Sequence, residues 1–152
     1  MLDVIKEYCA GGIVYNDGRV LTIKIASNKE IIFPKGHIWP EESHQDTAIR
    51  EVFEETGYKT KIIAPLDSLS YEFDKNDKHH EKIVYYYLME LLDKSVKPTP
   101  KREIGEDFVN LWLSTADALK LLTHQNSKDL LKKTLEIINS KNSGSIQQKI
   151  TI

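Results

Sequence analysis

The 152-residue sequence has little cysteine, no long apolar run and no excess of basic residues. Its single cysteine, Cys9, cannot form an internal disulfide and lies in an apolar stretch, so we expect a buried thiol in a reducing cytoplasm. No apolar stretch approaches the roughly 18 residues of a membrane span, and the acidic start disfavours a signal peptide. Because Lys and Arg number 21 against 23 Asp and Glu, the charge disfavours DNA and RNA partners.

The composition is that of one globular domain. Hydrophobic residues make up 40% and charged residues 29% of the chain, and no internal repeat or low-complexity segment interrupts it. We expect a single domain over residues 1–141, followed by a polar, disordered tail over residues 142–152. The oligomeric state is left open.

Short β-branched and aromatic runs separated by turn residues predict seven strands. They cover residues 8–15, 19–25, 30–33, 59–64, 67–73, 82–91 and 108–113, with the polar stretch DKNDKHH as a hairpin loop. Helical spacing of apolar residues predicts helices over 43–56, over 114–122 and over 127–139. This order of elements indicates an α+β fold with a mixed sheet between helical layers.

The helix expected over 43–56 has two chemically different faces. Its apolar face is expected to pack on the sheet and carries Ala48, Ile49, Val52 and Phe53. Three acidic residues at i, i+3 and i+4 share the other face, namely Glu51, Glu54 and Glu55. Carboxylates at this spacing repel one another, so we expect a cation against them rather than a merely solvated face. Hard carboxylate oxygens suit Mg²⁺ or Mn²⁺.

Two residues are expected to set the ends of this helix. Ser43 is a suitable N-cap, and Gly57 can adopt the left-handed conformation that ends a helix. These two residues therefore define where the helix that carries the acidic face begins and ends.

The acidic residues belong to a longer pattern, GX5EX7REUXEEXGU, in which U is a bulky aliphatic residue. All seven fixed positions match: Gly36, Glu42, Arg50, Glu51, Glu54, Glu55 and Gly57. Val52 fits the first U, whereas Tyr58 departs from the aliphatic residue usual at the last, a packing position. On these residues the sequence resembles the Nudix hydrolase family, since seven fixed residues are far more specific than a lone glycine motif. The resemblance implies a Nudix-type α/β/α sandwich and metal-dependent hydrolysis of a nucleoside diphosphate linked to another group.

The same resemblance implies roles for the acidic face. Glu51, Glu54 and Glu55 would bind metal or orient and deprotonate the attacking water, with the division of labour left open. Arg50 would pair with a neighbouring glutamate, and we expect Glu42 to orient Arg50 rather than bind metal. Close carboxylates raise one another's pKa, so one of them could serve as general base.

The loop before the helix supplies further candidate residues. The carbonyl of Gly36 could add an oxygen ligand to the metal. Lys35 could offset negative charge that develops on a phosphate. His37 is a candidate substrate contact, although a plain loop histidine explains it equally well.

Three further segments resemble the asymmetric diadenosine tetraphosphate hydrolases: FPKGHIWPEES, KIVYYYL at 82–88 and EDFVNLWLS at 106–114. That resemblance implies a phosphate contact for Lys82, stacking on adenine for Tyr86 and an additional acid near the metals in Glu106. Alternation along a strand places Lys82 and Tyr86 on one face, about 7 Å apart at ~3.3 Å per residue.

Each of these assignments has an alternative. Tyrosines in strands commonly pack with one wet end, and Tyr71 and Phe73 on the neighbouring strand are alternative ring partners for a base. Glu103 competes with Glu106 as the extra acid. His79 and His80 lie in the expected hairpin loop, where solvated histidines are the default.

Together these residues predict a Mg²⁺- or Mn²⁺-dependent enzyme acting on a small nucleotide, with cleavage of diadenosine tetraphosphate to ATP and AMP as the leading hypothesis. Other candidate substrates are a nucleoside triphosphate, ADP-ribose, an inositol pyrophosphate or an RNA 5′ end. A nucleotide-sensing module without activity is a further alternative. Such a module is expected to have lost its acidic residues, and all three are present here.

Overall fold

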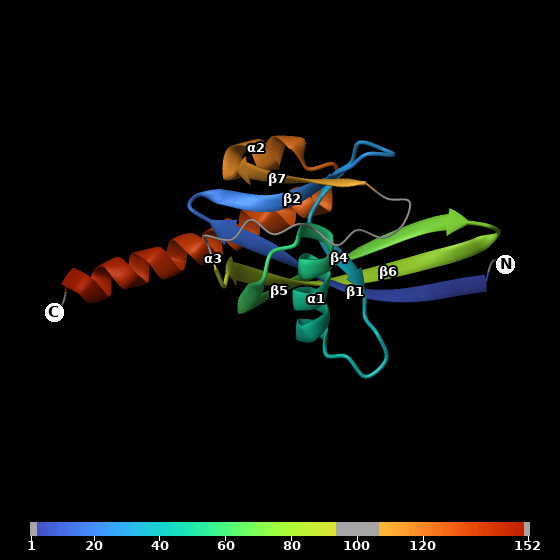
Figure 1. The fold of residues 1–152 in the computed structure, drawn as a ribbon, viewed down its shortest axis with the longest axis horizontal. Coiled ribbons are helices and arrows are strands. Elements are labelled where there is room, and N and C mark those ends of the chain that lie inside the picture. The colour runs from blue at the N-terminus through green and yellow to red at the C-terminus, as the bar shows by residue number, and fades with distance from the viewer. Residues whose placement is uncertain (1–2, 94–106, 151–152) are drawn as a thin grey trace.

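The structure, a computed structural model, describes residues 3–93 and 107–150, the last nine by their backbone alone. Figure 1 shows the arrangement of the helices and strands. The strands are β1 (Asp3–Asn16), β2 (Arg19–Ile25), β3 (Ile31–Ile32), β4 (Lys35–His37), β5 (Thr60–Lys75), β6 (Lys78–Leu91) and β7 (Phe108–Ser114). The helices are α1 (His44–Thr56), α2 (Thr115–Leu121) and α3 (Gln125–Ile150).

The described strands form a mixed sheet. Its main path runs β3-β2-β1-β6-β5, while β4 pairs with β1 and β7 pairs with β2. The pairing of β1 with β6 is parallel, and the other pairings are antiparallel. The expected α+β class is confirmed.

Strand β1 separates two apolar cores because its side chains alternate between the faces of the sheet. Cys9 and Ile13 pack on one face with residues of α2 and α3, including Leu131. Ala10 and Val14 pack on the other face with residues of α1. Helices therefore cover both faces, and Figure 1 shows α1 crossing in front of the sheet.

Helix α1 begins and ends as its sequence predicts. Ser43 Oγ accepts a hydrogen bond from the Asp46 N–H at 3.0 Å, and this satisfies one free donor of the first turn. Gly57 has φ 82°, and its N–H donates to the Phe53 carbonyl at 2.7 Å. Ala48 and Val52 are fully buried, whereas Phe53 is only half-buried.

The β5–β6 hairpin is longer than expected. Residues 59–64 and 67–73 form one strand with two irregularities in its pairing, rather than two separate strands. The turn contains only Asn76 and Asp77, whose φ values of 53° and 58° are typical of a tight two-residue turn. The expected loop DKNDKHH is therefore wrong, because Lys78 to His80 continue the ladder, and His79 and His80 are half-buried rather than solvated.

The C-terminal helix is also longer than expected. We expected a helix ending at residue 139 and a disordered tail from Asn142, whereas α3 continues to Ile150. No proline interrupts this stretch, and each added residue contributes another backbone hydrogen bond. The division into a domain over 1–141 and a separate tail stays a prediction. In the described part of the chain, no helix has both the length and the apolar character needed to cross a membrane.

Candidate active site

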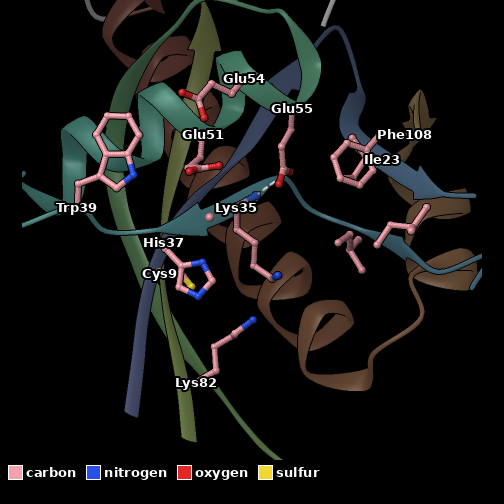
Figure 2. A pocket seen from close by; sticks show the side chains of 13 residues that line it. Cys9, Ile23, Lys35, His37, Trp39, Glu51, Glu54, Glu55, Lys82 and Phe108 are labelled. Atoms are coloured by element: carbon pink, nitrogen blue, oxygen red, sulfur yellow. Dashed lines mark hydrogen bonds between the residues drawn. The ribbon is translucent and has the colours of Figure 1, made fainter. Parts of the chain in front are cut away.

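The acidic face of α1 forms one wall of a cavity of about 410 Å³, which lies within the range of roughly 300–1,000 Å³ typical of ligand sites. In Figure 2, the amines of Lys35 on β4 and Lys82 on β6 point into the same space below the acidic residues. The structure thus brings together the following predicted residues: Lys35, Gly36, His37, Glu51, Glu54, Glu55 and Lys82.

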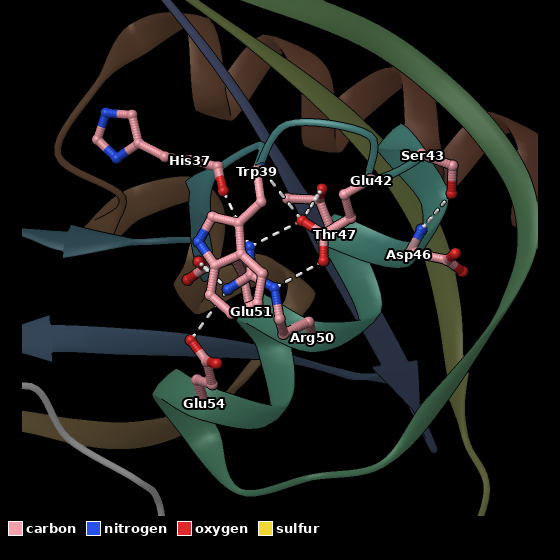
Figure 3. A network of polar contacts seen from close by, with 9 residues as sticks. All are labelled: His37, Trp39, Glu42, Ser43, Asp46, Thr47, Arg50, Glu51 and Glu54. Atoms are coloured by element: carbon pink, nitrogen blue, oxygen red, sulfur yellow. Dashed lines mark hydrogen bonds and ion pairs between the residues drawn. The ribbon is translucent and has the colours of Figure 1, made fainter.

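Arg50 is held at the centre of a polar network (Figure 3). Its Nε and Nη2 donate to the two carboxylate oxygens of Glu42 at 2.8 and 2.9 Å. Its Nη1 donates to Glu51 at 2.7 Å and to Glu54 at 3.1 Å, and its Nη2 also donates to the His37 carbonyl at 3.0 Å. A guanidinium has five N–H donors, and these five bonds match that number. The expected pairing of Glu42 with Arg50 is confirmed.

The pairing with Arg50 keeps the Glu42 carboxylate ionised near neutral pH. Hydrogen bonds from Arg50 lower the pKa of Glu42 to about 2, although partial burial opposes this shift. The Thr47 hydroxyl also donates to Glu42, at 2.5 Å. The same bonds raise the pKa of Arg50. Arg50 is therefore a cation of the chain itself that lies against the acidic face. Its single positive charge compares with four carboxyl groups nearby, those of Glu42, Glu51, Glu54 and Glu55.

The oxygen atoms around this face are suitable ligands for a hard divalent cation. A Cβ atom placed on Gly36 would overlap the Glu51 carboxylate, so only glycine lets β4 lie this close to it. The Lys35 N–H donates to Glu55 at 3.1 Å, which brings a second α1 carboxylate to the same strand. Carboxylate oxygens beside backbone carbonyls are the ligands that Mg²⁺ and Mn²⁺ prefer. When bound there, such a metal would neutralise phosphate charge and activate water.

A second cavity of about 270 Å³ adjoins the first, and the two share Ile25, Ile32, Lys35 and Lys82 as lining residues. Its other walls carry aromatic rings, including Tyr71, Phe73 and His124. The rings of Tyr71 and His124 meet edge to face at 5.7 Å. Together the two cavities form one trough, with an acidic part and an aromatic part joined at the two lysines.

Tyr86 does not have the open ring that stacking on a base requires. Its side chain is 2% exposed and packs edge to face on Phe33, with ring centres 6.2 Å apart. Burial raises its pKa well above the ordinary value, and its hydroxyl shares a hydrogen bond with Tyr71. Tyr86 is therefore a core residue that also contributes to the wall of the aromatic cavity, and the alternatives Tyr71 and Phe73 line the same cavity with more exposed rings.

Glu7 is a site residue that the sequence did not reveal. One of its oxygens lies 3.4 Å from His37 Nε2 and 3.7 Å from Lys82 Nζ, and the other lies 3.4 Å from His80 Nδ1. Burial raises the pKa of Glu7, but the hydrogen bond with His37 and the charge of Lys82 hold it below the ordinary value. Glu7 and Lys82 are direct neighbours across the parallel β1–β6 pairing, which no local pattern predicts.

Two sets of candidate metal ligands remain beside the residues of this trough. Glu103 and Glu106, the candidate additional acids, lie outside the described residues. Glu72, His79 and Glu81 place potential metal-ligand atoms within 4.8 Å of one another on the β5–β6 hairpin. Strand alternation directs these side chains to the face opposite Lys82, so they do not contribute to the cavity.

Two curated proteins are similar to this chain in sequence. A probable DHNTP pyrophosphohydrolase of Lactococcus lactis is 33% identical over 96 residues, which cover 60% of this chain and 58% of that protein. The asymmetrical bis(5′-nucleosyl)-tetraphosphatase of Mus musculus is 30% identical over 99 residues, 65% of each chain. This chain thus spans less than two thirds of the length of both curated relatives.

The fold and the family are shown by two further comparisons. A crystal structure of an Ap4A hydrolase from C. elegans matches with a TM-score of 0.68 at 22% identity, covering 88% of this chain and 99% of that one. The family model of the NUDIX domain matches residues 6–134. The match spans most of the sequence, including the whole acidic helix and the loop before it, and the chain therefore belongs to the NUDIX domain family.

Proposed function

We propose that the protein is a metal-dependent pyrophosphohydrolase that cuts a dinucleoside polyphosphate, with diadenosine tetraphosphate cleaved to ATP and AMP as the leading reaction. The observation that carries this proposal is the continuous trough. Its acidic part suits a metal-bound phosphate chain, its two lysines suit phosphate charge, and its aromatic part suits a base. The name of the Mus musculus relative supports the same choice.

In the proposed reaction, a water oxygen forms a bond to phosphorus while the phosphoanhydride P–O bond breaks. The bridging oxygen leaves with the ATP product, and the proton of the water passes to a carboxylate. Glu51, Glu54 and Glu55 are the candidate metal ligands and proton acceptor, with Arg50 holding the first two in place. Lys35 and Lys82 would offset negative charge on the phosphates. Catalysis of this kind rests mostly on positioning and charge neutralisation.

A second candidate is hydrolysis of DHNTP, the compound in the name of the Lactococcus lactis relative. The two candidates differ in products, so chromatography of a reaction with each substrate separates them. Hydrolysis of diadenosine tetraphosphate is supported if the enzyme releases ATP and AMP from it with a far higher kcat/KM than it shows for DHNTP. The reverse preference supports the second.

The setting that we propose is a reducing cytoplasm, with a small nucleotide as the partner. Cys9 is 1% exposed, and a lone buried thiol suits that environment. The acidic wall of the trough would repel a long phosphate backbone beyond the two lysines, which disfavours DNA and RNA as partners.

The test is Glu54→Gln assayed with Mg²⁺ and with Mn²⁺. Glu54 is partly open to the cavity, and Gln preserves its shape and its ability to accept from Arg50 while removing the charge. We expect turnover to fall by on the order of 100-fold or more. Glu90→Gln is the matched control, because Glu90 forms an exposed ion pair with Lys61 outside the trough. Full activity of Glu54→Gln in a folded protein would contradict the role of the acidic face.

A further inference from the structure

Trp39 is an unusually open tryptophan on the wall of the acidic cavity. Its side chain is 54% exposed although it lines a concave site. One face of the indole lies on the Arg50 guanidinium, whose central carbon is 3.5 Å from the ring centre (Figure 3). Because the five hydrogen bonds of Arg50 fix that guanidinium, Trp39 rests on a rigid planar support.

Phe73 has a corresponding position in the aromatic cavity. Its ring is 40% exposed and stacks on His80 with ring centres 4.8 Å apart and planes inclined by 3°. Each cavity is therefore lined by an open aromatic ring that has a flat, nitrogen-containing group on its covered side. Trp39 lines the first cavity but not the second, and Phe73 lines the second cavity but not the first.

The side chains that line both cavities include the two basic ones, Lys35 and Lys82. The trough thus offers an aromatic ring, a cationic stretch and a second aromatic ring in that order. A molecule with a base at each end of a polyphosphate chain has the same order of chemical groups. A molecule with one base leaves one of the rings uncovered.

We propose that Trp39 stacks on the second base of a dinucleoside polyphosphate and makes the enzyme prefer substrates with two bases over substrates with one. This inference rests on the proposed function and adds a specificity-determining residue to it. Every base has a π-face, so stacking on Trp39 selects for the presence of a second base and not for its identity. Diadenosine tetraphosphate and its mixed adenosine–guanosine counterpart are therefore expected to be cleaved at similar rates.

The first experiment compares diadenosine tetraphosphate with adenosine 5′-tetraphosphate as substrates for Trp39→Leu and Trp39→Phe. We expect Trp39→Leu to lower the ratio of kcat/KM for the two-base substrate over the one-base substrate by about tenfold, mostly through KM. Trp39→Phe keeps an aromatic face and is expected to retain most of the ratio. Any effect of the substitution on Arg50 acts on both substrates and cancels in the ratio.

Tyr8→Leu is the matched control. Tyr8 is an aromatic residue of β1 that is 46% exposed and lines neither cavity of the trough. Its substitution is expected to leave the ratio unchanged. An unchanged ratio in Trp39→Leu, or an equal loss on both substrates, would overturn the proposed stacking and leave Trp39 as a support for Arg50 alone. A wild-type enzyme without activity on the two-base substrate would instead refute the proposed function.

The second experiment needs no turnover. The chain has two tryptophans, so Trp112→Phe leaves Trp39 as the single indole fluorophore. A nonhydrolysable diadenosine tetraphosphate analogue is expected to quench this emission saturably, and adenosine 5′-tetraphosphate is expected to quench it less. Emission that stays constant while calorimetry shows the analogue binding would overturn the inference, whether or not the enzyme cleaves the substrate.

Discussion

Gly36→Ala tests how closely strand β4 must approach the acidic face of α1. The added methyl group would overlap the Glu51 carboxylate, and Gly36 has no positive φ that would oppose alanine for another reason. The carboxylate must move by about 1 Å, and a misplacement of that size costs on the order of 100-fold in rate. That loss corresponds to about 2.7 kcal/mol of activation free energy.

The same movement weakens the ion pair between Arg50 and Glu51, which is 2.7 Å long and mostly shielded from solvent. Loss of one charged hydrogen bond destabilises by about 1.5–3 kcal/mol, and 1 kcal/mol lowers the Tm of a domain of this size by about 2–4 °C. We therefore expect Gly36→Ala to lose most of its kcat and several degrees of Tm while remaining folded at 25 °C.

The assay is steady-state hydrolysis with saturating Mg²⁺, alongside circular dichroism to establish folding. Gly18→Ala is the control, since Gly18 lies in an open turn with nothing within 4 Å of an added Cβ. Its φ of 77° strains alanine by about 1 kcal/mol, but it lies outside the cavity. Activity of Gly36→Ala within threefold of wild type would refute the link between this contact and catalysis.

Three further predictions concern ionisable groups. Because Arg50 lowers the pKa of Glu42 to about 2, the ionised carboxylate stabilises the fold fully above pH 4.5 and loses this effect as the pH falls toward 2. Glu42→Gln should therefore be less stable than wild type in urea at pH 7, with a gap that narrows below pH 4.5; a constant gap would contradict this. Burial raises the pKa of the Cys9 thiol, so a thiol reagent should label it only after denaturation, and rapid labelling of native protein would show that it is accessible. Lys82→Met should raise KM by about tenfold with little change in kcat, since it removes a phosphate cation and leaves Glu7 facing the ligand; an unchanged KM would exclude a phosphate contact.

Local sequence pattern determined much of the fold. The predicted strand over 19–25 matches β2, and the helix over 43–56 matches α1 with its cap, because periodicity and capping depend on neighbours in the chain. The prediction of a hairpin loop over DKNDKHH was wrong, because β propensity says little about how far two strands continue to pair. The strand pairing continues through most of these polar residues, and the ring of Phe73 stacks on that of His80 at this end of the hairpin.

The sequence by itself determined the acidic face, its arginine and the loop glycine, because their spacing on one helix and one loop is a local property. Tertiary structure alone decided three other features. It paired Glu7 with Lys82 through a parallel register between distant strands, and it left the Tyr86 side chain only 2% exposed in the wall of the aromatic cavity. It also laid Trp39 on Arg50. Each of these three features depends on how separate segments of the chain pack together. Burial and strand register follow from that packing and not from local sequence.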